Sequence, residues 1–237
     1  MEIPFTSKEI KEAVNLLKNN KSTGCDGISA ELLKQSPETI YDMIAEIYNE
    51  TASTGERPKE LLLGTVCAIQ KPGKKKGPIA NLRPITLLSM LRKMLAICMK
   101  KRIIDHLDDR IPPSQAAYHK GKSTTEHVFA TKVLAEKAIT SKNHPIFIIM
   151  LDMSKTFDTV NRNILLTDPD KVINTDEIHL ISMMLETHLQ IKWGNSFSET
   201  FDTNTGVPQG DGLSANQFTF YLSQAMREKH QDHTKDP

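Results

Sequence analysis

The sequence from Ile146 to Asp158 reads IFIIMLDMSKTFD, and the interpretation of the rest of the chain depends on it. Six apolar residues, from Ile146 to Leu151, run without interruption before the carboxylate of Asp152. An unbroken apolar run of this length, rich in β-branched residues, predicts a strand that is buried on both faces. Asp152 would then lie at the rim of a sheet, where a carboxylate either caps the following turn or binds Mg²⁺ through its oxygens.

A second stretch, GVPQGDGLS from Gly206 to Ser214, predicts a tight turn that leads into a helix. Its glycines let the backbone approach a ligand closely, and Pro208 fixes one backbone dihedral angle. The side-chain amide of Gln209 offers two donors and one acceptor. Taken alone, a turn of this kind is usually only a loop.

Together, LDMSKTFDTVNR from Leu151 and GVPQGDGLSANQFTFYL from Gly206 resemble motifs A and B of reverse transcriptases of the non-LTR (LINE-type) retrotransposons. Three upstream stretches are similar to further elements of that family and occur in its order: KSTGCDGI from Lys21, NLRPITLL from Asn81 and QAAYHKGKSTT from Gln115. The five stretches cover nearly the whole chain. The resemblance therefore implies an RNA-directed DNA polymerase domain of retrotransposon origin.

The resemblance implies an α/β (α+β), helix-rich fold with the fingers and a partial palm of a right-hand polymerase. Residues 1–145 would form a fingers-like region with a basic β-hairpin, and residues 146–237 an incomplete palm with motifs A and B and no thumb. Such a palm would expose a sheet edge and apolar helix faces, which favours self-association. Periodicity and capping signals predict helices near residues 6–18, 30–34, 37–54, 89–107, 126–139, 176–189 and 214–228, and strands near 65–71, 83–88 and 190–197.

Composition is ordinary for a globular protein, since 38% of the 237 residues are apolar and 25% are charged. The three cysteines are scattered without a C-x-x-C pair, which argues against a disulfide framework or a zinc site. We therefore expect an intracellular protein, nuclear or cytoplasmic. We expect no membrane association, because we find no signal peptide and no apolar run long enough to span a bilayer.

The net charge is only +1, yet the segment from Lys71 to Arg102 contains ten basic residues and no acidic one. A patch of this kind suits phosphate backbones or triphosphates; the alternative is a solvated basic face that binds nothing specific. Lys71 and Arg83 are expected to face each other across a hairpin, where two cations repel unless an anion lies between them. Arg92 is expected on the outward, basic face of the helix that follows.

The resemblance implies two-metal nucleotidyl transfer, in which Mg²⁺ or Mn²⁺ promotes attack of a primer 3′-hydroxyl on the α-phosphate of a dNTP. Asp152 would be the catalytic metal ligand, assisted by the backbone carbonyl of Met153. Phe157 matches the family's steric gate, which rejects a 2′-hydroxyl; the alternative is ordinary core packing. The other residues implied to bind the nucleotide are Lys71, Arg83, Gln209 and Gly210, and those expected on the RNA template or DNA primer are Lys74, Lys75, Lys76, Lys120 and Lys122.

The family's second carboxylate motif, a Y/F-x-D-D hairpin, is not found before Pro237, and the pair Asp108 and Asp109 lies in the wrong place for it. A single aspartate should severely impair catalysis, since loss of core catalytic groups costs other enzymes about 10⁴-fold or more. Two hypotheses follow: a truncated polymerase domain that is inactive as it stands, and a non-catalytic nucleic-acid-binding remnant of that domain. An intron-encoded maturase is a weaker match, because Phe157 and KSTGCDGI favour the retrotransposon class.

Overall fold

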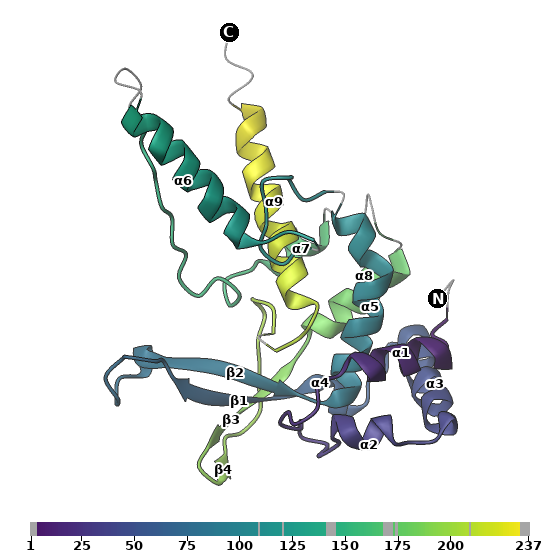
Figure 1. Cartoon of the computed structure of the whole chain (residues 1–237). Helices are drawn as coiled ribbons and strands as arrows, with labels where there is room; N and C mark the ends of the chain where they lie inside the picture. The colour runs from purple at the N-terminus through teal and green to yellow at the C-terminus, as the bar shows by residue number, and fades with distance from the viewer. Residues whose placement is uncertain are drawn as a thin grey trace.

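The structure is a computed structural model that describes residues 4–108, 110–119, 121–140, 146–167, 173, 175–208 and 210–232. Over these residues it combines helices with a five-stranded sheet, which confirms the mixed α/β prediction. Figure 1 shows a group of helices around the N-terminal region, a long β-hairpin that extends away from it, and α6 and α9 rising above the sheet. The elements are α1 (Ser7–Leu16), α2 (Ala30–Lys34), α3 (Glu38–Thr54), α4 (Lys59–Leu62), β1 (Leu63–Gln70), η1 (Ile79–Asn81), β2 (Leu82–Leu88), α5 (Met90–Asp108), α6 (Thr124–Thr140), α7 (Arg162–Thr167), α8 (Thr175–Leu185), β3 (His188–Trp193), β4 (Ser196–Phe197), β5 (Phe201–Asp202) and α9 (Ser214–Asp232).

The N-terminal helices begin and end where the sequence provides caps. Before α1, Thr6 Oγ1 accepts a hydrogen bond from the Glu9 N–H, and a Glu9 carboxylate oxygen accepts one from the Thr6 N–H. Ser29 caps α2 in the same way, through the Leu32 N–H. Gly55 ends α3 in the left-handed conformation, with φ +77°. The predicted capping box at Thr6 and the predicted helix end at Gly55 are confirmed. The prediction that Ser36 caps α3 is wrong, because Pro37 is the N-cap and no side chain caps this helix.

The core lies among the helices, and α5 runs through its centre. Along α5, Met94, Ala96, Met99 and Ile103 are fully buried, and the helix packs against α1, α4, α8 and α9. The predicted outward position of Arg92 is wrong, because this residue is only 1% exposed. Its guanidinium is tolerated in the core because it donates to backbone and side-chain oxygens, as described below.

The sheet joins the two halves of the chain. β1 pairs antiparallel with β2 and parallel with β3, and β3 pairs antiparallel with both β4 and β5. The parallel pairing places Leu63 beside His188 and Cys67 beside Lys192. The predicted division of the chain into fingers and palm at residue 145 stays a prediction. The sheet contains strands from both sides of this boundary, since β1 pairs with β3.

The predicted buried strand at Ile146 to Met153 is wrong: the structure assigns no strand to this segment. Its apolar side chains are exposed, from 46% for Ile146 to 90% for Leu151. A strand needs partners for its N–H and C=O groups, and within the described part of the chain the strands of the sheet pair with one another instead.

Further apolar surface lies on α6, which has no buried residue. Val128 and Phe129 are each 68% exposed and Ile139 is 83% exposed. This helix lies in the predicted fingers-like region, so it does not test the expectation of exposed apolar helix faces, which concerned the palm. No helix among the described residues is long and apolar enough to cross a membrane.

Candidate functional site

The segment after Asp152 and the glycine-rich turn are joined through their backbones. The Val207 N–H donates to the Phe157 carbonyl and the Gly206 N–H to the Val160 carbonyl, each at 2.8 Å. Gly206 has φ +80°, and a Cβ there would lie 2.9 Å from the Asp158 Cα and carbonyl oxygen. Glycine at this position is therefore what allows the two segments to approach so closely.

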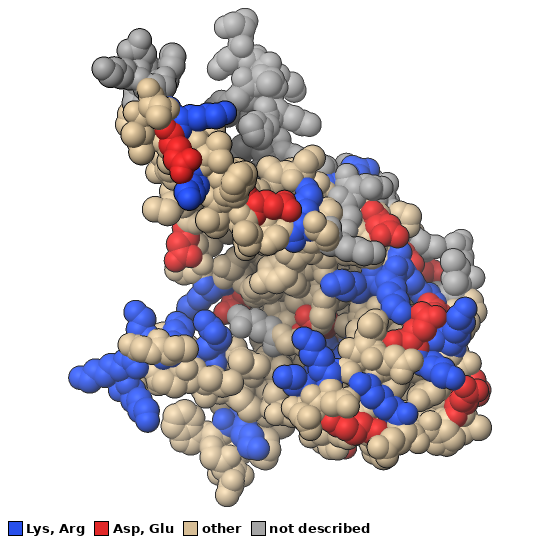
Figure 2. Space-filling view, viewed as in Figure 1, with Lys and Arg blue, Asp and Glu red and all other residues tan. Residues whose placement is uncertain are grey.

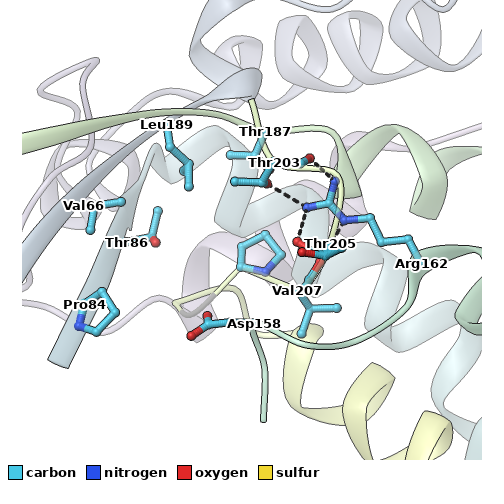
Figure 3. Close-up of a pocket in the computed structure, with 12 residues that line it drawn as sticks. Val66, Pro84, Thr86, Asp158, Arg162, Thr187, Leu189, Thr203, Thr205 and Val207 are labelled. Carbon is cyan, nitrogen blue, oxygen red and sulfur yellow. Dashed lines mark hydrogen bonds between the residues drawn. The ribbon is translucent and has the colours of Figure 1, made fainter. Parts of the chain in front are cut away.

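Arg162, the first residue of α7, holds the chain that leads into this turn. Its Nε donates to the Gly206 carbonyl at 2.8 Å, and Nη2 donates to Thr203 Oγ1 at 2.9 Å and to the Thr205 carbonyl at 3.1 Å. Nη1 donates to the Thr203 carbonyl. Figure 3 shows the guanidinium surrounded by these acceptors. Burial lowers the pKa of Arg162, but a guanidinium remains charged at neutral pH.

A cleft of about 240 Å³ separates the turn from the sheet. Figure 3 shows that Val66, Thr86 and Leu189 contribute the sheet wall, while Asp158 and Val207 come from the joined segments. The remaining lining residues are Pro84, Arg162, Thr187, Thr203, Thr205, Gly206 and Pro208. The cleft thus lies between motif A, motif B and the basic hairpin. Its lining among the described residues does not include the predicted site residues Lys71, Arg83, Asp152, Phe157 and Gly210, so their roles stay predictions.

The far end of the turn packs on β2. Gly210 has φ +126°, and a Cβ there would lie 2.5 Å from the Thr86 carbonyl oxygen, so a larger residue would displace the turn. Gly210, a predicted nucleotide-binding residue, thus lies beside Thr86 in the wall of the cleft. Its nucleotide-binding role stays a prediction. Gln209 lies outside the described residues.

Asp211 follows as a buried carboxylate. Its Oδ1 accepts from the Leu213 N–H at 2.9 Å, and its Oδ2 lies 3.9 Å from Arg92 Nε. Arg92 also donates to the carbonyls of Leu61, at 2.8 Å, and Met184, and to Thr187 Oγ1 at 3.0 Å. Burial raises the pKa of Asp211 and lowers that of Arg92, and each charge partly offsets the shift of the other. Sequence reasoning missed this pair because Arg92 was counted with the surface cations.

The KSTGCDGI stretch supports the same region from the other side. A Cβ on Gly24 would lie 2.5 Å from the Ser89 Cα, so this loop packs directly on the junction between β2 and α5. Asp26 is half-buried, and burial raises the pKa of its carboxyl although Oδ1 accepts a hydrogen bond from the Ile28 N–H at 3.2 Å.

The predicted metal ligands are accessible but sparse. Asp152 is exposed, and the Met153 carbonyl accepts from Thr156 Oγ1 at 3.0 Å. Among the described residues, no group of three or more His, Cys, Asp or Glu side chains is placed to hold a metal ion. This donor set does not fit a complete two-metal centre, which needs several carboxylate oxygens.

Phe157, the predicted steric gate, is half-buried at the joined segments. Its ring lies 5.2 Å from the ring of Phe218 on α9, centroid to centroid, at an interplanar angle of 36°. This ring contact packs Phe157 against the hydrophobic core, which is the alternative to the gate role. The gate role stays a prediction.

The basic hairpin differs in detail from the prediction. Arg83 pairs directly with Ile69, whereas the Lys71 N–H donates to the Asn81 carbonyl at 2.9 Å, so the predicted opposition of Lys71 and Arg83 is wrong. Asn81, which lies opposite Lys71, is the last residue of the 3₁₀ turn η1 that precedes β2. The Lys71 ammonium donates to the Ala80 carbonyl at 2.9 Å, and the Arg83 side chain is exposed.

The remaining predicted cations fall into three groups. Lys74, Lys75 and Lys76 are exposed at the hairpin tip, where Figure 2 shows basic side chains projecting at the left of the molecule. Lys122 donates to the Pro113 carbonyl and so supports its own loop. Lys120 lies outside the described residues.

Residues 69–235 match the reverse transcriptase (RNA-dependent DNA polymerase) family. The chain is 29% identical over 213 residues to the "Probable RNA-directed DNA polymerase from transposon BS" of Drosophila melanogaster, covering 89% of this chain and 23% of that protein. It is 27% identical over 230 residues to the "RNA-directed DNA polymerase from mobile element jockey" of Drosophila funebris, covering 93% of this chain and 24% of that protein. The chain thus spans about a quarter of the length of these relatives.

Among solved structures, the fold is similar to a chain of the "Partial Cas6-RT-Cas1--Cas2 complex", with a TM-score of 0.52 and 15% sequence identity. The similarity covers 95% of this chain and 34% of that chain, and at this identity it supports the fold alone. The resemblance to the polymerases of non-LTR mobile elements, drawn from five sequence motifs, is confirmed by the relatives. The chain belongs to the reverse transcriptase family.

Proposed function

We propose that this chain is the nucleotide- and template-binding part of an RNA-directed DNA polymerase, with residues 1–145 as fingers and 146–237 as palm. The observation that carries the proposal is the cleft of about 240 Å³ between motif A, motif B and the sheet of the basic hairpin. Motif A and motif B are held together there by the two 2.8 Å backbone bonds from Gly206 and Val207. Such pre-organisation favours a ligand that must be held in one orientation.

The cleft's surroundings suit a deoxynucleoside triphosphate paired with an RNA template and a DNA primer. Lys71 and Arg83 on the hairpin would bind the triphosphate, and Gly210 allows the backbone to approach the base pair that Gln209 would support. Phe157 would exclude a 2′-hydroxyl. The lysines proposed to contact template or primer phosphates are Lys74, Lys75, Lys76, Lys120 and Lys122.

For Mg²⁺ or Mn²⁺, the chain would supply the Asp152 carboxylate and the Met153 carbonyl. The described residues do not complete a two-metal donor set, so we propose that these 237 residues bind primer–template and nucleotide but transfer nucleotides very poorly. This donor set favours the second candidate function, a non-catalytic nucleic-acid-binding module.

All three cysteines are free thiols, and we place the protein inside the cell, in the nucleus or the cytoplasm.

The test is primer extension on an RNA template with Mg²⁺ and dNTPs, run in parallel with fluorescence anisotropy of the labelled primer–template. We expect binding that weakens steeply with salt, and no extension above that of an Asp152→Ala variant. Extension that is lost in Asp152→Ala would show that the chain is a working polymerase and would reject the non-catalytic reading. Absence of salt-sensitive binding would reject the proposed function altogether.

A further inference from the structure

We propose that the β3–β4 hairpin is a stacking surface for single-stranded nucleic acid, outside the cleft. The site, termed here the aromatic hairpin, has Ile191, Trp193 and Phe201 on one face and Lys192 and Phe197 on the other. The inference takes the class of partner, a nucleic acid, from the proposed function, but it assigns a separate site and a strand type. Figure 1 shows this hairpin projecting from the sheet on the side away from α6 and α9.

One face of the aromatic hairpin continues the sheet wall of the cleft. Side chains alternate along β3, so Leu189, Ile191 and Trp193 share a face. Leu189 lines the cleft, and its cross-strand partner on β5 is Phe201. Ile191 and Phe201 are each 42% exposed, and Trp193 at the end of the strand is 72% exposed. A stripe of apolar and aromatic side chains therefore leads from the cleft towards the hairpin tip.

The other face combines a ring with a cation. Lys192 pairs across the strands with Phe197, and its Nζ lies 5.7 Å from the centre of the Phe197 ring. Phe197 is 54% exposed. An ammonium held beside an open aromatic ring suits a nucleotide, whose base can stack on the ring while its phosphate meets the cation.

Charge around the hairpin favours a polyanion. β1, β2, β3 and the connecting residues 71–81 contain no acidic residue. The cations on these segments are Lys71, Lys74, Lys75, Lys76, Arg83 and Lys192. On β5, Asp202 forms an ion pair with His188, and Glu199 lies in the loop between β4 and β5. Taken together, β1, β2 and β3 thus carry cations and no carboxylate, and Asp202 on β5 is the sheet's acidic residue. This distinguishes the surface from α6, whose exposed apolar residues lie among acidic and basic side chains.

Stacking on exposed rings requires bases with an open face. In a duplex the bases are already stacked on one another, so a single strand gains more from Trp193 and Phe197 than a duplex does. We therefore assign the aromatic hairpin to unpaired nucleotides. The assignment is independent of any chemistry at Asp152.

Trp193 is the only tryptophan of the chain, so its fluorescence reports directly on this site. The experiment is a titration of the full chain with a 12-nucleotide oligouridine, with the tryptophan emission and the anisotropy of the labelled oligonucleotide recorded on the same samples. We expect saturable quenching of Trp193 with the same midpoint as the anisotropy change. A blunt RNA duplex of equal length should bind through its phosphates with little quenching.

Variants separate stacking from general electrostatics. Trp193→Ala should weaken oligouridine binding roughly 10-fold, and Trp193→Phe should retain most of the affinity because the ring remains. The matched control is Phe129→Ala on α6, an equally exposed aromatic residue that should leave binding unchanged. Circular dichroism melting of each variant checks that the fold is intact.

Three outcomes would overturn the inference. In the first, oligouridine binds the wild type without quenching Trp193 and binds Trp193→Ala with full affinity. In the second, the duplex quenches Trp193 as much as oligouridine does. In the third, the tryptophan emission shifts with protein concentration when no oligonucleotide is present. In the first case salt-sensitive binding still supports the proposed function and only the stacking site fails. If neither nucleic acid binds at all, the proposed function fails as well.

Discussion

Arg92 Nε lies 3.9 Å from Asp211 Oδ2, and both side chains are buried, at 2% and 4% exposure. The pair links α5 to the end of the glycine-rich turn. Through its other nitrogens Arg92 also reaches Leu61 before β1 and Met184 on α8. One guanidinium thus connects α5, α4, α8 and the end of the glycine-rich turn, and it also donates to Thr187, which lines the cleft.

We predict that Arg92→Met will lower the free energy of unfolding by about 3–5 kcal/mol, because it leaves the Asp211 carboxylate buried without a compensating charge. Asp211→Asn should cost only about 1–2 kcal/mol, since the amide still accepts from the Leu213 N–H and Arg92 keeps its other acceptors. Urea denaturation measures both. Arg83→Met, on an exposed cation, is the control and should change stability by less than about 0.5 kcal/mol. If Asp211→Asn lowers the free energy of unfolding as much as Arg92→Met does, the prediction that loss of the arginine costs more is wrong.

The close contact of motifs A and B makes a second prediction. Gly206→Ala should be more destabilising than Gly73→Ala, although both glycines have positive φ, +80° and +69°. Only at Gly206 would the added Cβ meet backbone atoms, at 2.9 Å, whereas at Gly73 it would point into open space. Thermal melting should show a loss of about 1 kcal/mol for Gly73→Ala, from backbone strain alone, and clearly more for Gly206→Ala. Equal losses would mean that the two segments separate easily.

The sequence predicted those features that depend on local signals. The Thr6 capping box, the end of α3 at Gly55 and the presence of the β1–β2 hairpin follow from turn and capping chemistry within a few residues. The family resemblance also assigned the two segments that meet at Gly206 to motifs A and B of one site. Hydrophobic periodicity alone could not have related segments so far apart in the chain.

Predictions that depend on distant partners were wrong. Helical periodicity could not show that Arg92 turns inward, because the carbonyls that accept its hydrogen bonds lie 31 and 92 residues away in the chain. The run from Ile146 to Leu151 has strand composition, but a strand exists only where another strand pairs with it. Arg83 pairs with Ile69 and not with Lys71, and the composition of the two strands does not specify this register.

Acid should weaken the contact between α1 and α5. Arg102 donates to Glu9 from Nε and Nη2, both at 3.0 Å. Burial opposes ionisation of Glu9, but hydrogen bonds from Arg102 and Thr6 hold its pKa below the usual value. The folded state therefore binds this proton less readily than the unfolded state. The stabilisation is complete above about pH 4.3 and is lost as the pH falls through the folded-state pKa.

The measurement is the melting temperature of the wild type and of Glu9→Gln between pH 7 and pH 2.5. At pH 7 the variant should be less stable by about 1–2 kcal/mol, a value reduced for partial exposure of the pair, and the difference should disappear at the acid end. Glu136→Gln is the control, because Glu136 and Lys132 are exposed and 3.9 Å apart, and it should show no difference at any pH. A Glu9→Gln deficit that persists at low pH would assign the effect to packing and not to charge.

Phe157 offers the sharpest test of a deoxynucleotide site at the junction of motifs A and B, because packing and steric gating predict different results. Its ring rests against Phe218, so Phe157→Ala and Phe218→Ala should each lower stability, by roughly 1–3 kcal/mol for half-buried rings. If Phe157 is also the gate, only Phe157→Ala will bind ribonucleoside triphosphates more tightly relative to deoxynucleoside triphosphates. We expect the discrimination to fall roughly 10-fold or more, measured by competition binding in the presence of primer–template. Because Phe218→Ala removes the same packing contact from α9, equal discrimination in the two variants would leave Phe157 as a core residue and place the sugar elsewhere.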